Sequence, residues 1–376
     1  MPSLMTGSLT IETVDFNALT DADLSAWTAM RQANPALESP YHHPDYHACV
    51  DQHQGGCRVT IAKREGTVVA ILPWQGGAFA RPSGAPLSDY QAIIAAPDTN
   101  IAVDTLLKGQ SVGAFHYTAI PADTAANGDE TCRMELTSAD TWRSERDGSY
   151  RRHLKSTRRR IRKADEEIGT PRIVVQSRDV DAYQALMHWK AQKFQDTGKF
   201  DVLANDGTAG LLRDLWERGP QAPLRADLHV LYFGGRIAAC DLGLTDGHVF
   251  HSWIVGYDPD LLTYAPGIQL LESLIDAAPE LGYRVIDLGS GTEGYKRQYA
   301  THAKYVSSGV ITLPTATGAL AAGYDRMELA LSEKTGDALG KIRRRYSQIA
   351  ACEPRFSKRS AAMASALGGH FKRDPA

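Results

Sequence analysis

The chain has 376 residues, enough for two domains, since a single hydrophobic core usually stops growing at about 250–300 residues. Apolar residues make up 43% and charged residues 23%, a balance that excludes wholesale disorder. The longest apolar run, Val68–Trp74, is far shorter than the roughly 20 residues that cross a bilayer. Residues 1–30 contain no Lys or Arg and no apolar stretch typical of a secretory signal. We therefore expect no transmembrane segment and a cytoplasmic protein.

The net charge of -3 conceals a strongly basic segment. Residues 151–163 hold eight Lys or Arg and no acid, and residues 341–373 are again basic, so both stretches are suited to polyanions. The five cysteines are scattered and form no Cys-x-x-Cys pair, which argues against a disulfide framework or a zinc ribbon. We expect reduced thiols and no bound metal.

Hydrophobic periodicity and turn residues predict two β-hairpins, each hinged at glycine. The hairpins are Arg58–Lys63 with Thr67–Trp74, and Leu228–Phe233 with Arg236–Leu244. A strand, a loop, a helix and a further strand follow each hairpin in the same order. These elements are residues 89–94, 101–108 and 114–120 in the first copy and 249–257, 266–278 and 283–288 in the second. The order indicates an internal duplication of one α/β unit.

Two further helices are predicted outside the repeat. Residues 151–163 form a basic helix whose only apolar residues, Leu154 and Ile161, lie one heptad apart. A second helix covers residues 325–350 and stops before Pro354. The first helix separates the two copies, and the second follows them.

The start of the helix at residue 266 is a candidate anion site. Pro266 suits the first helical position, and Gly267 has no side chain to block an approaching ligand. Unpaired N–H groups and the positive end of the helix dipole favour a phosphate at such a terminus. An ordinary helix start explains the same residues, so the next strand has to be considered with it.

A glycine-rich turn follows that next strand. Residues 287–292 read Asp-Leu-Gly-Ser-Gly-Thr, which is similar to the first motif of methyltransferases that bind S-adenosylmethionine. In that fold the motif opens the sheet, whereas here only 82 residues follow Gly294, and most of them indicate helix. We keep the strand and turn and reject the methyltransferase interpretation.

Four stretches in this order resemble the GNAT acyltransferases, in particular the CelD-type (cellulose-biosynthesis-like) and FemAB-like branch with two GNAT-like halves. They are Ser39-Pro40-Tyr41 with Pro44-Asp45-Tyr46; Leu87-Ser88-Asp89-Tyr90; Tyr264-Ala265-Pro266-Gly267; and Asp287-Leu288-Gly289 through Glu293 to Tyr295-Lys296-Arg297. The resemblance implies an α/β fold of tandem GNAT-like mixed sheets flanked by helices, with a C-terminal helical extension. The implied division is a degenerate half over residues 1–145, a catalytic half over 146–320 and the extension over 321–376.

The resemblance also implies transfer of an acyl group from acyl-CoA or a similar thioester to an amine, with no tightly bound cofactor. The donor would bind at Tyr264, Pro266, Gly267, Ile268 and Gln269. The GNAT phosphate loop usually has a cation or Gln where Tyr264 stands and a small residue where Gln269 stands, so the donor need not be acetyl-CoA. The acceptor would be a small-molecule or glycan amine in cell-envelope, polysaccharide or natural-product biosynthesis.

Acyl transfer to an amine needs donors for the developing oxyanion and a base for the proton. In this fold the strand over 249–257 presents backbone N–H groups beside the donor. His251 on that strand is a candidate base. Glu293, Tyr295 and Lys296 are candidate catalytic residues because a glycine-flanked turn exposes them at a sheet end. The alternatives are a satisfied core or surface group for His251, binding of a donor phosphate or an acidic acceptor for Lys296, and simple packing for Tyr295.

Asp89 and Tyr90 in the first half are candidates for orienting the acceptor amine. The alternative is structural: Asp89 is a turn residue, and the Tyr90 ring packs against its neighbours. Two alternatives to a thioester-dependent enzyme stay open. One is a FemAB-like transferase that uses aminoacyl-tRNA, bound through Arg158, Arg159 and Arg162. The other is a non-catalytic accessory protein of polysaccharide synthesis.

Overall fold

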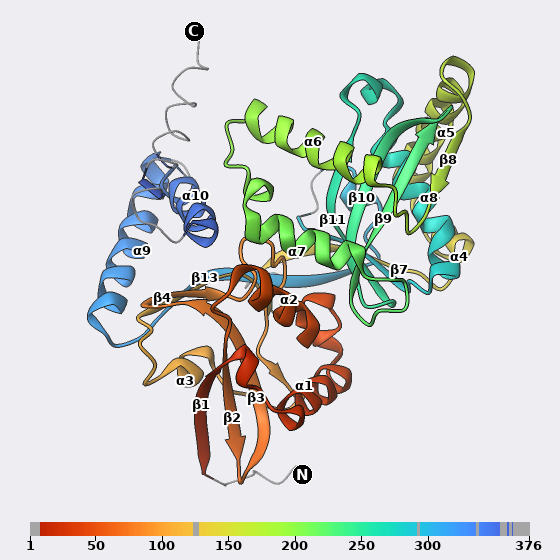
Figure 1. The fold of residues 1–376 in the computed structure, drawn as a ribbon. Coiled ribbons are helices and arrows are strands. Elements are labelled where there is room, and N and C mark those ends of the chain that lie inside the picture. The colour runs from red at the N-terminus through yellow and green to blue at the C-terminus, as the bar shows by residue number, and fades with distance from the viewer. Residues whose placement is uncertain are drawn as a thin grey trace. The chain divides into compact units, whose positions relative to one another are not determined.

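The computed structural model describes residues 8–122, 128–291, 294–335, 338–353, 359–360 and 363. The chain forms two compact units, Met1–Pro121 with Ser307–Ala376 (unit 1) and Ala122–Val306 (unit 2). Each unit contains strands flanked by helices (Figure 1). The predicted α/β class with mixed sheets is confirmed.

The limits of these units differ from the predicted limits at 145/146 and 320/321. Residues 122–145 belong to unit 2, and the helices after residue 315 belong to unit 1. The difference arises because the compact units reflect where segments pack, whereas the predicted limits follow the order of repeated elements along the chain. The division into two GNAT-like halves and an extension stays a prediction.

Unit 1 is built on a sheet with the strand order β1-β2-β3-β4-β6-β13, and β5 pairs with β3. Neighbours from β1 to β4 are antiparallel, and β4 and β6 are parallel. The strands are β1 (Leu9–Asp15), β2 (Arg58–Arg64), β3 (Thr67–Gly76), β4 (Phe79–Pro82), β5 (Ile94–Ala95), β6 (Ala114–Ala122) and the part of β13 (His302–Thr312) from Ser307 on. The α-helices are α1 (Asp21–Ala33), α2 (Pro44–Gln54), α3 (Val103–Leu107), α9 (Ala316–Thr335) and α10 (Ala338–Cys352).

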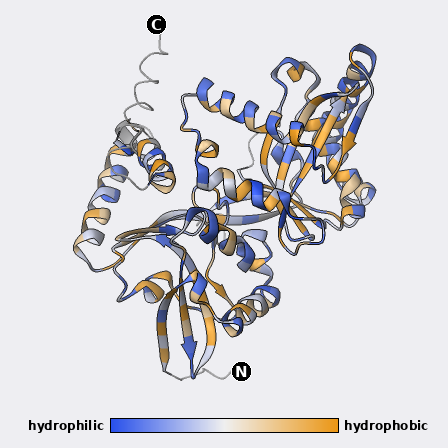
Figure 2. Cartoon of the chain, viewed as in Figure 1, coloured by the Kyte–Doolittle hydropathy of each residue, from blue (hydrophilic) through white to orange (hydrophobic). Residues whose placement is uncertain are grey.

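Side-chain alternation along β2 and β3 gives this sheet a core on each face. Ile61 and Ile71 pack with Trp27 of α1 on one face. Leu72, the neighbour of Ile71, packs with Leu106 of α3 on the other. Successive strand residues point to opposite faces, so one run of apolar residues supplies both clusters. Hydrophobic residues recur along these strands in Figure 2.

The strand predicted over residues 89–94 is wrong for most of its length. Only Ile94–Ala95 is a strand, β5. The backbone amide of Gln91 donates to the Ala119 carbonyl of β6 at 2.9 Å, and the Gln91 side-chain oxygen accepts from the amides of Thr118 and Ala119. Because a side chain occupies donors that a second strand would use, the segment follows β6 without a regular ladder.

Unit 2 has the strand order β13-β7-β12-β11-β10-β9-β8. All neighbours are antiparallel except β11 and β12, which are parallel. The strands are β7 (Asp129–Glu135), β8 (Pro171–Val174), β9 (Arg225–Phe233), β10 (Arg236–Thr245), β11 (Val249–Tyr257), β12 (Val285–Ser290) and the part of β13 up to Val306. The α-helices are α4 (Ala139–Ser144), α5 (Gly148–Glu167), α6 (Val180–Asp196), α7 (Asp206–Glu217) and α8 (Pro266–Leu281). The second predicted hairpin is therefore confirmed as β9 and β10.

Helices cover both faces of the unit 2 sheet. The apolar face of α8 buries Leu271, Leu274 and Ile275 against Phe250 and Ile286. On the opposite face, the Cys240 thiol of β10 contacts the Ala182 carbonyl of α6. Figure 1 shows α6 and α7 together on that side. The central strands are buried on both faces. Burying a polar side chain there costs free energy unless the side chain has a hydrogen-bond partner, so an unpaired one indicates a function.

The basic helix is α5, and it extends beyond the predicted residues at both ends. Asp147 caps its start by accepting from the amides of Ser149 and Tyr150. Tyr150, Thr157 and Ala164 are its buried residues, spaced by seven. These three residues pack α5 against the rest of unit 2 and leave most of its Lys and Arg side chains exposed to solvent.

In the described part of the C-terminal region, two helices, α9 and α10, are present where one was predicted over 325–350. Arg343 of α10 donates to both carboxylate oxygens of Glu328 on α9, at 2.7 and 3.2 Å, and this bidentate pair joins the helices. None of the helices in the described part of the chain is long and apolar enough to cross a membrane.

Candidate active site

The strands β11 and β12 pair for only three residues and then separate. Their ladder ends at His251 and Asp287. β11 continues to Tyr257 as a partner of β10 alone among the strands described. Its edge toward β12 therefore carries backbone groups with no strand partner, and these groups can bind an extended ligand in place of a strand.

A β-bulge lies where the strands separate. The register between β10 and β11 shifts so that Leu242 pairs with Ile254 and Gly243 pairs with Ser252, which leaves Trp253 as the extra residue. A Cβ on Gly243 would lie 2.1 Å from the Phe250 ring, so only glycine fits here. The bulge redirects the second half of β11.

Asp241 of β10 is the most unusual side chain at this point. Its Oδ2 accepts from the Ser252 hydroxyl at 2.7 Å, and its Oδ1 is buried without a hydrogen-bond partner among the described residues. Burial raises the pKa of Asp241 to about 7, although the Ser252 hydrogen bond and the nearby charges of His251 and Lys190 oppose the rise. A carboxyl group with this pKa can accept and release a proton near neutral pH.

His251 lies at the end of the paired region and is fully buried. Its Nδ1 is 3.7 Å from Oδ1 of Asp287, and Oδ2 of Asp287 is 3.4 Å from the Arg133 guanidinium on β7. Burial alone would raise the pKa of Asp287, but the hydrogen bonds and charges of His251 and Arg133, with the Gly289 amide, keep this pKa below its ordinary value. Asp287 thus lies within ion-pair distance of both the His251 ring and the Arg133 guanidinium.

Lys296 and Tyr295 follow the glycine-rich turn after β12. The Lys296 ammonium donates to the carbonyls of Leu288 at 2.8 Å and Ser290 at 3.2 Å, so it closes the turn onto the end of β12. The Tyr295 ring is 41% exposed. Burial first, and then the charge of Asp241, raises the pKa of Tyr295, so its hydroxyl stays protonated. Glu293, the remaining predicted residue of this turn, lies outside the described residues.

A buried carboxylate ties this turn to α8. Glu272 of α8 accepts from the hydroxyls of Tyr299 at 2.8 Å and Tyr150 at 3.1 Å. The Arg143 guanidinium of α4 donates to the same carboxylate at 3.1 Å and also binds Asp276. Glu272 thus connects α4, α5, α8 and the segment that carries Tyr295 and Lys296.

The start of α8 has one amide left over. Ile268 and Gln269 both donate their backbone N–H to the Ala265 carbonyl, at 3.1 and 3.2 Å. The Gly267 amide has no hydrogen-bond partner within the part of the chain that the structure describes. A Cβ on Gly267 would meet only Cδ1 of Tyr257, at 3.7 Å. The helix start is therefore open and lies beside the end of β11.

Two predicted donor-binding side chains have structural contacts. The Tyr264 hydroxyl donates to Glu167 of α5 at 2.6 Å, and the Gln269 side-chain amide donates to the Tyr264 carbonyl at 2.9 Å. Pro266 is buried and Ile268 is half-buried. These contacts hold the loop at the helix start, and they leave the backbone of Gly267 as the group best placed to bind a ligand.

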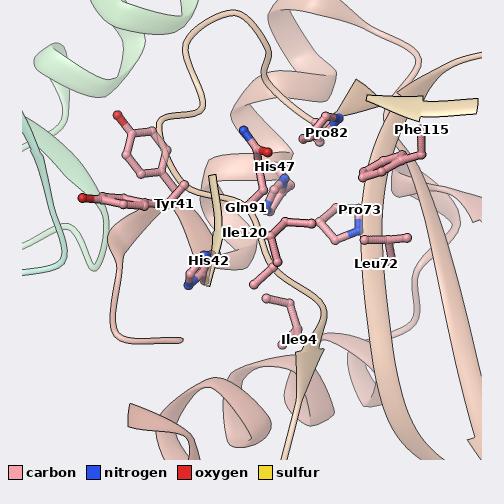
Figure 3. A pocket seen from close by; sticks show the side chains of 13 residues that line it. Tyr41, His42, His47, Leu72, Pro73, Pro82, Gln91, Ile94, Phe115 and Ile120 are labelled. Atoms are coloured by element: carbon pink, nitrogen blue, oxygen red, sulfur yellow. The ribbon is translucent and has the colours of Figure 1, made fainter. Parts of the chain in front are cut away.

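Asp89 and Tyr90 belong to unit 1, whereas the residues above belong to unit 2. Asp89 is exposed. Tyr90 lines a cavity of about 10 Å³ that also contacts His42 and His47 (Figure 3), with room for about one water molecule. Burial first lowers the pKa of both histidines to about 3, so both rings are neutral. The role of Asp89 and Tyr90 in binding an acceptor stays a prediction.

The sequence analysis identified β10, β11 and β12 of this site, but it missed β7 and did not single out Asp241, Asp287 or Arg133 as the charged residues. The available signal was an acidic residue inside an otherwise apolar strand, as in Ala239-Cys240-Asp241-Leu242. Such a residue is costly to bury unless it is paired or functional. That signal does not say which strands are neighbours, and the cluster exists only because β10, β11, β12 and β7 are adjacent.

Comparison with known proteins gives a family-model match for part of the chain. Residues 151–297 match the model of the acetyltransferase (GNAT) domain, and these residues contain β9 to β12 and α8. The match covers less than half of the chain. The predicted superfamily is confirmed, and the predicted helix and strand around residue 267 lie within the matched residues.

Solved structures resemble the chain over most of its length. The structure of FemX shares 10% identity with a TM-score of 0.51 and covers 80% of this chain and 97% of its own. This likeness shows a FemAB-like fold. Two others have lower TM-scores: the C-terminal domain of a lysylphosphatidylglycerol synthetase from Agrobacterium fabrum (12% identity, TM-score 0.48, 82% and 96% covered) and a tandem GNAT protein from clavulanic acid biosynthesis (8%, 0.47, 82% and 100%). No curated protein matches the sequence.

Proposed function

We propose that this protein is an N-acyltransferase that moves an acyl group from acyl-CoA or a similar thioester to an amine. The observation that carries the proposal is the separation of β11 from β12 beside Asp241, whose pKa of about 7 suits a proton acceptor. The GNAT domain supports acyl transfer in general. The acceptor class, a small-molecule or glycan amine, rests on the family resemblance.

The donor would lie along the open edge of β11. Its acyl carbonyl would accept from backbone N–H groups between Ser252 and Tyr257, which are already fixed by pairing with β10. Donors that are in place before the reaction stabilise the developing oxyanion without a reorganisation cost. The phosphates of the donor would bind at the open Gly267 amide, where the helix dipole favours negative charge.

Proton transfer would involve Asp241 and Tyr295. The acceptor ammonium would first lose one proton to solvent. As the neutral amine attacks the carbonyl carbon and the C–N bond forms, Asp241 would accept the second proton from the nitrogen. The C–S bond would then break, and the Tyr295 hydroxyl would give its proton to the departing thiolate. The Asp241 charge contributes to the raised pKa of Tyr295. In this scheme the proton on Asp241 would then return to Tyr295.

His251, the base predicted from the sequence, would act in this scheme through position. It is fully buried and lies against Asp287, and its charge is one of the influences on the pKa of Asp241. Lys296 would act in the same way, because its ammonium already binds two backbone carbonyls of the turn. Glu293 stays a predicted catalytic residue.

Donor binding and turnover test the proposal directly. The purified chain is incubated with acetyl-CoA, longer acyl-CoAs, an acylated carrier protein and aminoacyl-tRNA, and native mass spectrometry records which donor binds. Release of free thiol is then followed with a panel of primary amines. We expect one thioester class to bind and thiol release to require an amine. Absence of binding by every thioester would contradict the proposal.

A second candidate function is aminoacyl transfer from tRNA, as the FemAB-like resemblance implies. The observation in its favour is that Arg158, Arg159 and Arg162 are all exposed on α5. Backbone contacts from such cations make RNA binding strongly dependent on salt. Binding of charged tRNA at low salt would favour this function over the thioester-dependent one if both R158Q and R162Q abolish that binding.

A further inference from the structure

Unit 1 contains a groove that the proposed reaction does not use. It has a volume of about 870 Å³ and lies between the β3–β4 hairpin, β6, β13 and the helices α9 and α10. This volume is within the range of about 300–1,000 Å³ that is usual for small-molecule sites. The groove is therefore large enough for a ligand.

The rim of this groove gathers exposed hydrophobic side chains. Leu320 of α9 is 71% exposed and Phe79 of β4 is 53% exposed, and Ile342 and Tyr346 of α10 are also exposed. Exposed apolar side chains that gather on one concavity, and do not lie scattered singly, indicate a binding surface. An apolar ligand would bury them.

One cation lies deeper than this rim. Arg81 of β4 is half-buried, its guanidinium Nε has no hydrogen-bond partner, and no carboxylate lies within ion-pair distance of it among the residues that the structure describes. Burial first, and then the charge of Arg359, lowers the pKa of Arg81. An unpaired guanidinium in such surroundings is costly, and an anion would remove the cost.

The other charged groups of the groove do not meet this need. Glu328 is already bound in two places by Arg343. Asp325 is exposed and contributes to the raised pKa of Arg343. Arg359, which also lines the groove, donates to the Glu353 carbonyl at 2.6 Å. Among the described residues, the groove thus offers an apolar surface beside the Arg81 guanidinium.

We propose that this groove binds one aliphatic chain that ends in a carboxylate, with the carboxylate on Arg81 and the chain along Phe79, Leu320 and Ile342. A fatty acid has this chemistry. The charge complementarity at Arg81 distinguishes this occupant from a purely apolar partner helix, which would leave the guanidinium unpaired.

Isothermal titration calorimetry on the full chain tests the proposal with dodecanoate below its micelle concentration. Three comparison probes separate the contributions: octanoate has the same head and a shorter chain, dodecyltrimethylammonium has the opposite charge, and acetate has the head alone. We expect dodecanoate to bind more than tenfold more tightly than octanoate, since each buried methylene adds about 0.8 kcal/mol of favourable free energy. Acetate should not bind measurably.

Two groove variants and one control locate the site. R81Q should weaken dodecanoate binding at least tenfold, since a hydrogen bond to a charged group is lost, and should not weaken dodecyltrimethylammonium binding. L320D places a negative charge on an exposed rim position and should weaken dodecanoate binding. R326Q removes an exposed arginine of the same helix α9 that does not line the groove, and it should bind dodecanoate as the natural chain does.

Equal dodecanoate affinity in R81Q and R326Q would overturn the proposal. Failure of dodecanoate to bind while the chain self-associates, with L320D abolishing the association, would assign the groove to a second copy and would also overturn it. Neither readout depends on acyl transfer, so a failure here is separate from a failure of the proposed function.

Discussion

At the scale of single residues, Asp241 has the environment expected of a proton acceptor. It combines a buried position, one hydroxyl partner and one oxygen without a partner in the described structure. Structural carboxylates in this protein differ from it, because Glu272 and Asp227 are surrounded by several donors. The contrast separates a group that holds the fold from a group that can exchange a proton.

We expect D241N to lower kcat by about 10²- to 10⁴-fold, the usual contribution of a general base. In the natural chain the rate should rise with pH through about 7, and D241N should lose this limb. The control is D260N, which changes an exposed aspartate of the same unit.

The stability of D241N tests the raised pKa of Asp241 independently of activity. The pKa of Asp241 is raised in the folded state, so its neutral form is favoured by folding, and stability is lost as pH rises from about 4 toward 7. D241N should therefore unfold at higher denaturant concentration than the natural chain at pH 8. Wild-type activity in D241N would rule out the assigned role.

The amide at Gly267 can be tested with two substitutions at one position. G267A should bind the donor nearly as the natural chain does, because a Cβ there meets only Tyr257 at 3.7 Å. G267D adds a negative charge at the proposed phosphate position and should weaken donor binding at least tenfold. Donor titration with calorimetry and a circular dichroism spectrum of each variant are the measurements. Equal binding by the two variants would place the donor phosphates elsewhere.

At the scale of elements, the turn after β12 depends on α8. Glu272 collects two tyrosine hydroxyls and a guanidinium from three other segments. Removing a buried acceptor from such a network leaves its donors unsatisfied, and breaking a buried ion pair in this way costs about 3–5 kcal/mol. The loop that carries Tyr295 and Lys296 is thus held in place through Glu272 of α8, the helix that precedes β12 in the chain.

E272L should lower the free energy of unfolding by roughly 3–5 kcal/mol. The control is D276N on the next turn of α8. Asp276 binds the same Arg143, but its side chain is 60% exposed, so the expected change is at most about 1 kcal/mol. Urea unfolding at pH 7 measures both. Similar losses in the two variants would show that burial does not set the contribution of this network.

Element prediction from the sequence was accurate where periodicity and turn residues agreed. Both hairpins, β11 and α8 appear at the predicted residues, since Gly66 and Gly234-Gly235 mark the turns and Pro266 marks the helix start. It was wrong over residues 89–94, where the Gln91 side chain replaces strand pairing. Local patterns do not report that kind of long-range substitution.

At the scale of the whole molecule, buried histidines couple stability to pH. His42 and His47 have pKa values of about 3 and His229 of about 4, in each case lowered first by burial. All three are neutral in the folded chain and gain a proton more readily when unfolded. The contribution of these histidines to stability is therefore complete above about pH 6.5 and is lost as pH falls toward 3–4, opposite in sign to the contribution of Asp241.

We expect the free energy of unfolding to fall by about 1.4 kcal/mol per buried histidine between pH 7.5 and 5.5. The variant H42Q/H47Q should show a shallower loss over this range, whatever its stability at pH 7.5. Urea unfolding at a series of pH values gives the slope, and H53Q, at the half-buried end of α2, is the control. An unchanged slope in the double variant would exclude these two residues as its cause.

The sequence alone determined the β9–β10 hairpin, β11, β12, α8 and the open helix start at residue 267, and it indicated the likeness to GNAT proteins, because each depends on residues close together in the chain. Only the tertiary structure decided the chemistry of the site. Asp241, His251, Asp287 and Arg133 come from four strands that are separate in sequence, and the pKa of Asp241 depends on burial between layers that no local pattern specifies. The same holds for Arg81, because only the packing of β4, α9 and α10 shows that no acidic partner stands beside it among the described residues.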